Sequence, residues 1–235
     1  MKRVLVKLSG EALGKDGKLF DFERFDEMAR SLKTIADDGL QTAVVFGGGN
    51  LWRGRRGDAR LVDPVLADQI GMTGTLMNAL LMQDALRRAS AKARTLCAFD
   101  VPRFADSYTQ RGAEAALAEG CILLLAGGTG HPFFSTDTGS ALRAIELNVD
   151  AILLAKNVDG VYDKDPNRFP DAKFLPHLTY DDAIAQNLQV MDLAAMVLCR
   201  DNGIPMLRVF DLKERDALVR AARGETGSGS VVTMN

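Results

Sequence analysis

The sequence is poor in the residues that build disulfides and histidine-dependent catalytic sites. Its 235 residues include only three cysteines, two histidines and one tryptophan. Cys97, Cys121 and Cys199 are odd in number, far apart and without a CxxC pair, and the first two stand in apolar runs. We therefore expect core thiols in a reducing compartment. We interpret His131 and His177 as structural or peripheral, so acid/base or triad chemistry that needs histidine is not expected.

Long apolar runs and blocks of like charge are also missing. No apolar run approaches the roughly 18 residues that a membrane span requires, and Lys7 interrupts what would be the apolar core of a signal peptide. The formal net charge is −2, without the basic stripe that is typical of a nucleic-acid-binding protein. We expect a soluble, cytoplasmic protein with neither a membrane nor a nucleic acid as partner.

Two common nucleotide-binding motifs do not occur either. The Walker A pattern GxxxxGK[ST] is missing, and no GxGxxG stretch joins an expected strand to a helix. The first absence argues against a P-loop kinase, and the second argues against a Rossmann oxidoreductase.

What the sequence does contain is a regular alternation of short apolar runs and amphipathic segments. The runs predict strands that are covered on both faces, at residues 3–8, 41–46, 95–99, 121–126, 150–155 and 205–210. Helical spacing and capping signals predict helices, at residues 21–38, 63–91, 110–118, 136–147, 179–186, 192–202 and 213–223. The alternation predicts a single α/β domain over residues 1–235, a three-layer αβα sandwich with a mainly parallel central sheet. Residues 225–235 are expected to add a last strand at the edge of that sheet.

Glycine-rich turns follow three of the expected strands. They are Lys7-Leu8-Ser9-Gly10, then Gly47-Gly48-Gly49-Asn50 with Arg53 close behind, and Gly127-Gly128-Thr129-Gly130. Parallel sheets bind ligands beyond the carboxyl ends of their strands, and backbone N–H groups in glycine turns form anion-binding concavities. Each turn alone is a weak signal, but three at one end of a sheet predict a phosphate site.

Charged residues stand near these turns. Lys7 lies at the end of an expected central strand, where a buried ammonium needs an anion, either a carboxylate or a ligand phosphate. Asp137 and Asp192 stand at expected helix starts, where they either cap the helices, or orient a lysine or coordinate magnesium at the phosphates. Residues 165–167, Asp-Pro-Asn, have the chemistry of a turn.

Several motifs together resemble the bacterial UMP kinase family, within the amino-acid-kinase superfamily. The match is collinear over nearly the whole chain, and it includes VLVKLSGEAL, VVFGGGNLWRG, ADQIGMTGTLMNALLMQDAL, AGGTGHPFFSTDTGSALRAIEL, VDGVYDKDP, LQVMDLAAMVL and IPMLRVF. The superfamily shares the lysine-glycine start and the second glycine turn, whereas GTGxPFFSTD and MDLAA are more specific to the UMP kinases. The resemblance implies an amino-acid-kinase-like fold, with a UMP-binding half over residues 1–150 and an ATP-binding half over residues 151–235.

The resemblance also implies roles for individual residues. Lys7 would be a catalytic cation oriented by Asp192, Arg53 would hold phosphates between donor and acceptor, and Asp137 would order the phosphates or their metal. ATP would contact Lys7, Leu8, Ser9, Gly10, Gly49, Arg53, Lys156, Asn157, Tyr162 and Asp165. UMP would contact Gly48, Asp68, Thr129, Gly130, His131, Pro132, Phe133, Phe134, Ser135 and Thr136. Mg²⁺ would arrive as Mg-ATP, near Asp137 and without a site fixed by the protein, and the family assembles as homohexamers.

The chemistry of the reaction agrees with this set of residues. A phosphate monoester has a second pKa of about 6, so the acceptor is already mostly a dianion at neutral pH and needs no general base. Cations, backbone N–H groups and Mg²⁺ are what such a transfer requires. The sequence thus predicts transfer of the ATP γ-phosphoryl group to UMP in pyrimidine nucleotide synthesis. The alternatives are a related acetylglutamate or carbamate kinase, and a non-catalytic nucleotide-binding storage or regulatory protein.

Overall fold

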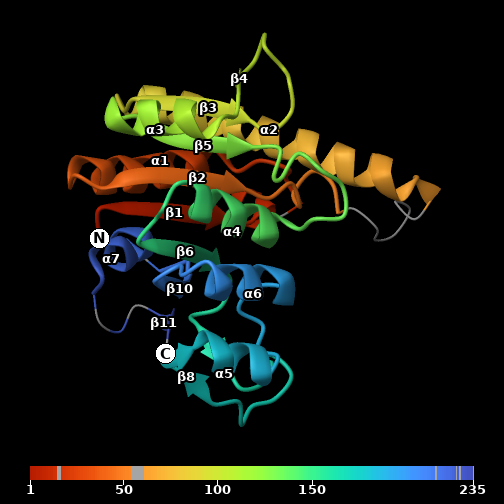
Figure 1. The fold of residues 1–235 in the computed structure, drawn as a ribbon, viewed down its shortest axis with the longest axis vertical. Coiled ribbons are helices and arrows are strands. Elements are labelled where there is room, and N and C mark those ends of the chain that lie inside the picture. The colour runs from red at the N-terminus through yellow and green to blue at the C-terminus, as the bar shows by residue number, and fades with distance from the viewer. Residues whose placement is uncertain (15–16, 54–60, 215, 226, 228, 235) are drawn as a thin grey trace.

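The strands form one large sheet through the middle of the molecule (Figure 1). The computed structural model describes residues 1–14, 17–53, 61–214, 216–225, 227 and 229–234. In this part of the chain the strand order is β4-β3-β5-β2-β1-β6-β10-β11-β9. The strands are β1 (Arg3–Leu8), β2 (Gln41–Phe46), β3 (Ala93–Cys97), β4 (Asp106–Ser107), β5 (Ile122–Ala126), β6 (Ala151–Lys156), β9 (His177–Thr179), β10 (Met206–Asp211) and β11 (Ser230–Thr233). Every pairing is parallel except that of β10 with β11.

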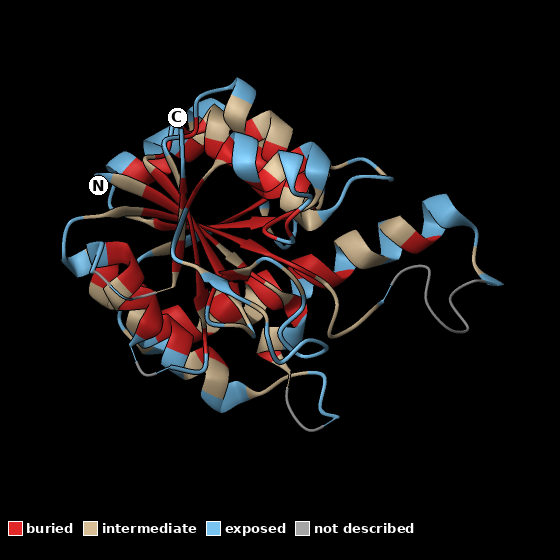
Figure 2. Cartoon of the chain, turned by 90° about the horizontal axis from the view of Figure 1, so that it is seen from below, coloured by how far each residue is buried: buried red, intermediate tan, exposed pale blue. Residues whose placement is uncertain are grey.

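Helices cover both faces of the sheet. They are α1 (Phe22–Asp37), α2 (Pro64–Arg88), α3 (Gln110–Ala118), α4 (Thr136–Glu146), α5 (Tyr180–Ala185), α6 (Leu193–Asp201) and α7 (Ala217–Arg223), with a short 3-10 helix η1 (Gly10–Leu13) after β1. One core cluster joins the sheet to α1, α2 and α7, and the other joins it to α3, α4, α5 and α6. Figure 2 shows the buried strands between these helical layers. The predicted α/β sandwich with a mainly parallel sheet is confirmed.

The alternation of side chains along β1 decides which face Lys7 occupies. Val4, Val6 and Leu8 belong to the core under α1, α2 and α7, whereas Leu5 belongs to the core under α4 and α6. Successive strand residues point to opposite faces, so Lys7 shares the face of Leu5. The lysine therefore points toward the layer that contains α4 and α6.

Helix starts follow the capping signals of the sequence. The side chain of Asp21 accepts a hydrogen bond from the Arg24 amide, and that of Asp63 accepts from the amides of Val65 and Leu66. Both aspartates satisfy N–H groups that have no partner within the helix. The predicted starts of the two helices are confirmed.

The structure corrects the predicted order at the carboxyl-terminal edge. The last strand, β11, is not at the edge, because β9 pairs with its outer side. Helix α7 starts at Ala217 rather than at residue 213, since Asp216 has a left-handed backbone with φ of 54°. A separate hairpin of β7 (Val161–Tyr162) and β8 (Phe174–Leu175) was also not predicted.

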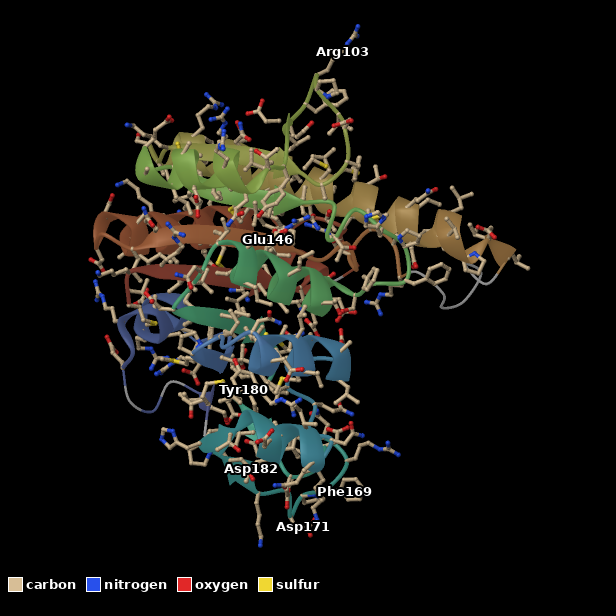
Figure 3. All side chains as sticks on the ribbon, in the orientation of Figure 1. Arg103, Glu146, Phe169, Asp171, Tyr180 and Asp182 are labelled. Carbon is tan, nitrogen blue, oxygen red and sulfur yellow. The ribbon has the colours of Figure 1, made fainter. Side chains whose placement is uncertain are left out.

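Two segments project from the body of the molecule. The amino-terminal half of α2 extends beyond the sheet in both ribbon views (Figures 1 and 2). The loop between β3 and β4 also stands out, with Arg103 at its tip (Figure 3). Among the described residues, none of the helices is long and apolar enough to cross a membrane.

Candidate functional site

The first two glycine turns touch each other at the carboxyl ends of β1 and β2. The Gly47 amide donates to the Leu8 carbonyl at 2.8 Å. A Cβ atom placed on Gly10 would lie 2.4 Å from the Gly49 nitrogen and 2.8 Å from the Gly47 oxygen. Only glycine allows the two backbones to approach so closely. The first two turns thus lie at the same end of the sheet, as the sequence predicts.

Helix α2 holds the second and third glycine turns together. The Asn78 side chain donates to the Gly47 carbonyl at 2.8 Å, and Thr75 Oγ1 accepts from the Gly127 amide at 2.8 Å. Both side chains are buried, so each hydrogen bond satisfies a backbone group that has no access to water. Sequence reasoning missed these two residues. The signal was a threonine and an asparagine among the apolar residues of a helix.

The glycines inside α2 have a packing function. A Cβ atom on Gly48 would lie 2.5 Å from the Gly71 carbonyl oxygen, and one on Gly74 would lie 3.6 Å from Gly48 Cα. Glycine in the middle of a helix costs roughly 1 kcal/mol relative to alanine. Here the small residues let the turn after β2 pack directly on the helix backbone.

A cavity of about 210 Å³ lies between α2, α4 and these turns. We call it the acceptor cavity, and it is lined by Gly48, Gly49, Trp52, Ala67, Asp68, Gly71, Met72, Thr75, Gly128, Thr129, His131, Phe134, Ser135 and Thr136. Seven of the ten residues predicted to contact UMP belong to its wall. Gly130, Pro132 and Phe133 do not, although the Phe133 amide donates to Asp68 Oδ2 at 2.7 Å.

A second cavity, of about 520 Å³, lies beyond β1 and β6. We call it the donor cavity, and it is lined by Lys7, Ser9, Glu11, Ala155, Lys156, Asn157, Val158, Gly160, Val161, Tyr162, Asp163, Lys164, Asp165, Pro166, Asn167, Asn187, Leu188 and Gln189. Six residues predicted to contact ATP belong to this wall, namely Lys7, Ser9, Lys156, Asn157, Tyr162 and Asp165.

The other predicted ATP contacts lie elsewhere. Leu8 has no exposed surface and packs in the core under α1 and α2, because it is one residue out of phase with Lys7 along β1. Gly10 packs on the second glycine turn, and Gly49 lines the acceptor cavity. Arg53 is outside both walls, where its Nη2 atom lies 3.4 Å from Glu11 Oε1. The side chain of Leu8 is therefore not available for the predicted contact with ATP.

Lys7 and Asp137 form an ion pair beside the donor cavity. Lys7 Nζ lies 3.0 Å from Asp137 Oδ1, and only 13% of the lysine side chain is exposed. Asp137 is in the first turn of α4, but Ser135 is the residue whose side chain caps that helix. The carboxylate of Asp137 is therefore free of the capping role and available to the lysine.

Asp192, which the resemblance implied would orient Lys7, contacts Asp137 instead of the lysine. Its backbone amide donates to Asp137 Oδ2 at 3.3 Å, and its carboxylate caps α6 by accepting from the Ala195 amide at 2.9 Å. The hydroxyls of Ser135 and Thr138 also donate to that carboxylate. The residue in contact with Lys7 is thus Asp137, and Asp192 joins the start of α4 to the start of α6.

A second lysine, Lys156, lies near this pair at the end of β6. Its Nζ atom donates to the Gln189 carbonyl at 2.8 Å. Burial lowers the pKa of Lys156 to about 8, Asp137 opposes the shift and Lys7 adds to it. Lys156 also lines a neighbouring cavity with Asp137 and Asp192. Lys7 and Lys156 thus line the donor cavity, and the carboxylates of Asp137 and Asp192 lie beside it.

No group of three or more histidine, cysteine, aspartate or glutamate side chains suited to a metal ion occurs among the described residues. Mg²⁺ commonly binds one or two carboxylates together with substrate phosphates and water. Asp137 and Asp192 are carboxylates of that kind, so the residues present fit a metal that is bound mainly by a nucleotide.

The sequence profile of the Amino acid kinase family matches residues 2–209. The uridylate kinase of Deinococcus radiodurans is 47% identical over 227 residues, which cover 95% of this chain and 92% of that protein. The uridylate kinase of Actinobacillus pleuropneumoniae is 44% identical over 233 residues, which cover 99% of this chain and 98% of that protein.

Solved structures of similar fold agree with the sequence matches. The UMP kinase of Ureaplasma parvum superposes with a TM-score of 0.93 at 33% identity, covering 99% of this chain and 98% of that one. The UMP kinase of Bacillus anthracis superposes with a TM-score of 0.94 at 38% identity, covering 99% and 96%.

Proposed function

The chain belongs to the amino acid kinase family, and from this premise we propose that it transfers the γ-phosphoryl group of ATP reversibly to UMP, giving UDP and ADP. The resemblance found in the motifs is confirmed by uridylate kinases that are 44–47% identical over nearly the whole chain. One structural observation supports the proposal most strongly. Two cavities open at the carboxyl-terminal edge of the same sheet, one beyond β2 and β5 and the other beyond β1 and β6, and the Lys7–Asp137 pair lies beside the larger of these two.

The main requirement on the site is to neutralise the negative charge of the two nucleotides. ATP and a UMP dianion repel each other, so catalysis depends on cations and N–H groups placed where charge spreads over the moving phosphoryl group. Lys7 is fixed by Asp137 at 3.0 Å and points from the end of β1 toward the donor cavity. Lys7 would bind the oxygens of the phosphoryl group in the transition state. The glycine turns would hold the phosphates of the donor and of the acceptor.

Mg²⁺ supplies further neutralisation when it is bound with ATP. Asp137 and Asp192 are the carboxylates that would hold it. Because Asp137 is already paired with Lys7, its charge also keeps the lysine oriented when the phosphates enter. No residue needs to remove a proton from the acceptor.

The walls of the two cavities support an assignment of the substrates. We place UMP in the acceptor cavity, where Asp68 is held by the Phe133 amide and would accept hydrogen bonds from the ribose. We place the adenine nucleotide in the donor cavity, where Tyr162 packs edge-on against Phe174 with ring centroids 5.5 Å apart. Arg53, which is 62% exposed, would move onto the phosphates from its place beside Glu11.

The projecting part of α2 supports assembly into a homohexamer. Leu66, Ile70 and Met77 are exposed by 49%, 36% and 45%, and their spacing places them along one stripe of the helix. An exposed apolar stripe of this kind marks a protein–protein contact, and a second copy of the chain would cover it. The activity would serve pyrimidine nucleotide synthesis in the cytoplasm.

A coupled assay of ADP release with Mg-ATP tests the proposed function. UMP is compared with CMP, dUMP, AMP, acetylglutamate and carbamate. Turnover that is much faster with UMP than with the non-nucleotide acceptors is expected. Turnover with acetylglutamate or carbamate alone would show a related kinase, and nucleotide binding without any turnover would show a storage or regulatory protein.

A further inference from the structure

Arg143 is a buried cation. It belongs neither to the charged group around Lys7 and Asp137 nor to the walls of the two cavities. It lies on α4, and only 8% of its side chain is exposed. A buried guanidinium is costly unless its donors are paired. Its position behind the acceptor cavity therefore calls for an explanation.

Three segments satisfy the guanidinium of Arg143. Nη1 donates to Glu146 Oε2 at 2.7 Å on the same helix, and Nη2 donates to the Gly128 carbonyl at 3.2 Å. The central carbon lies 3.8 Å from the centre of the Tyr108 ring, which is a favourable cation–π distance. Arg143 thus joins α4, the third glycine turn and Tyr108, which lies in the segment between β4 and α3.

Glu146 and Tyr108 keep the guanidinium in place. The Tyr108 hydroxyl donates to Glu146 Oε2 at 2.7 Å, and the Gln110 side chain donates to the Glu146 carbonyl at 2.6 Å. Burial, reinforced by Glu146, raises the pKa of Tyr108 far above its ordinary value, so the phenol remains a donor. Figure 3 labels Glu146 at the end of α4.

The Gly128 carbonyl, which accepts the hydrogen bond from Arg143, belongs to a peptide that has little rigidity of its own. Gly128 has φ of 57°, and glycine permits a peptide to rotate between orientations that other residues exclude. Because a trans peptide directs its C=O and N–H oppositely, rotation of the Gly128–Thr129 unit would reverse both groups. Gly128 and Thr129 line the acceptor cavity, so that rotation would change its polar wall.

We propose that Arg143 is a positioning residue for the nucleoside monophosphate: by holding the Gly128 carbonyl, it selects one orientation of the Gly128–Thr129 peptide on the wall of the acceptor cavity. Gly139, one turn earlier on α4, supports the same peptide, since a Cβ atom there would lie 3.3 Å from Gly128 Cα. This inference rests on the proposed function, because it concerns the acceptor of that reaction.

Arg143→Lys tests the inference while keeping the positive charge. A lysine cannot present two donors in the fixed fork of a guanidinium or stack its plane on a ring. We expect the KM for UMP to rise about tenfold, since small displacements at a substrate site have effects of this size or more. The KM for ATP should change less than twofold. The dissociation constant of UMP, followed by the fluorescence of Trp52 in the cavity wall, should rise in parallel.

Two further variants keep the test decisive if Arg143→Lys folds poorly. Glu146→Gln leaves the arginine in place but weakens its partner, and it should raise the KM for UMP by a smaller factor. In Arg143→Ala, added guanidinium ion should restore part of the UMP affinity. Arg24→Lys is the matched control, because Arg24 and Glu27 form an exposed pair of the same helical spacing at 3.2 Å, and it should change neither KM.

The outcomes separate the inference from the proposed function. A folded Arg143 variant whose two KM values change equally, or whose UMP affinity is unchanged, overturns the positioning role. A parent chain without UMP turnover, in contrast, removes the proposed function and the inference with it.

Discussion

The acceptor and donor cavities lie at the same edge of the sheet but are lined by different kinds of chemical group. The donor cavity is lined by three lysines and three acidic residues, which are Lys7, Lys156, Lys164, Glu11, Asp163 and Asp165. The acceptor cavity is lined by four glycines and one carboxylate, with backbone groups held by α2 and α4. On the proposed function, side-chain charge would bind the triphosphate, whereas a preformed backbone would bind the monophosphate. Changes on the two sides should therefore have different kinetic effects.

The largest effect is expected at Lys7. Lys7→Ala removes the cation that we propose to act on the transferred group, and turnover should fall by about 10²–10³ or more, as it does when a single electrostatic group at a transition state is lost. Circular dichroism and thermal unfolding should show that the fold is intact. A folded Lys7→Ala protein with near-native turnover would end the assignment of Lys7 as a catalytic residue.

Gly48→Ala should affect the acceptor side most. Its Cβ atom would lie 2.5 Å from the Gly71 carbonyl oxygen, so either the turn or α2 must shift. We expect the KM for UMP to rise by about 10–100-fold, a range that fits misplacement of about 1 Å. Gly49→Ala is the comparison, since its Cβ atom would lie 3.7 Å from Glu11 Cγ, and steady-state kinetics should show a smaller change. An equal or larger effect at Gly49 would contradict the role of the Gly48–Gly71 contact.

Asp68→Asn should weaken UMP without weakening ATP. The amide that replaces the carboxylate is a poorer acceptor for the Phe133 N–H and for a ribose hydroxyl. Loss of a charged hydrogen bond of roughly 1.5–3 kcal/mol corresponds to a rise of about 10–100-fold, and we expect the lower end of that range. Michaelis constants for both substrates provide the measurement. Similar increases for ATP and UMP would move Asp68 out of the acceptor site.

The smallest effect is expected from pH on the donor side. The pKa of Lys156 is about 8, so its side chain is charged below that pH and neutral above it. If it attracts ATP, the KM for ATP should be constant below pH 7 and rise about threefold by pH 9, since the loss of one charge pair costs about 1 kcal/mol or less. Lys7 and Asp137 face the same amine. Lys156→Arg stays charged and should abolish the rise; a rise that survives belongs to another group.

The sequence predicted the positions of helices and strands better than it predicted which strands pair with each other. Capping residues located α1 and α2, and the apolar runs located the central strands, because these signals are local. The antiparallel pairing of β10 with β11 and the outer position of β9 depend on contacts between distant segments. No periodicity in the sequence encodes such contacts.

The candidate site shows the same division. The glycine turns and Lys7 could be found at the ends of the expected strands, and Asp137 could be found at an expected helix start. The choice of Asp137 as the partner of Lys7 could not, since it depends on Ser135 capping α4 in its place and on the strand phase that turns Lys7 toward that helix. Thr75, Asn78 and Arg143 were missed because each acts through the backbone of another segment.

The central place of β1 has a consequence for how the protein folds. β1 pairs with β2 on one side, but on the other it pairs with β6, where Val4 lies opposite Ala151. A growing chain must therefore keep one edge of its first strand unpaired until more than half of the molecule has been made. Such distant pairing slows folding and prolongs the exposure of strand edges that can aggregate. Since Lys7 is on this strand and Asp137 is on α4, the helix that precedes β6, activity should return during refolding later than helical structure does.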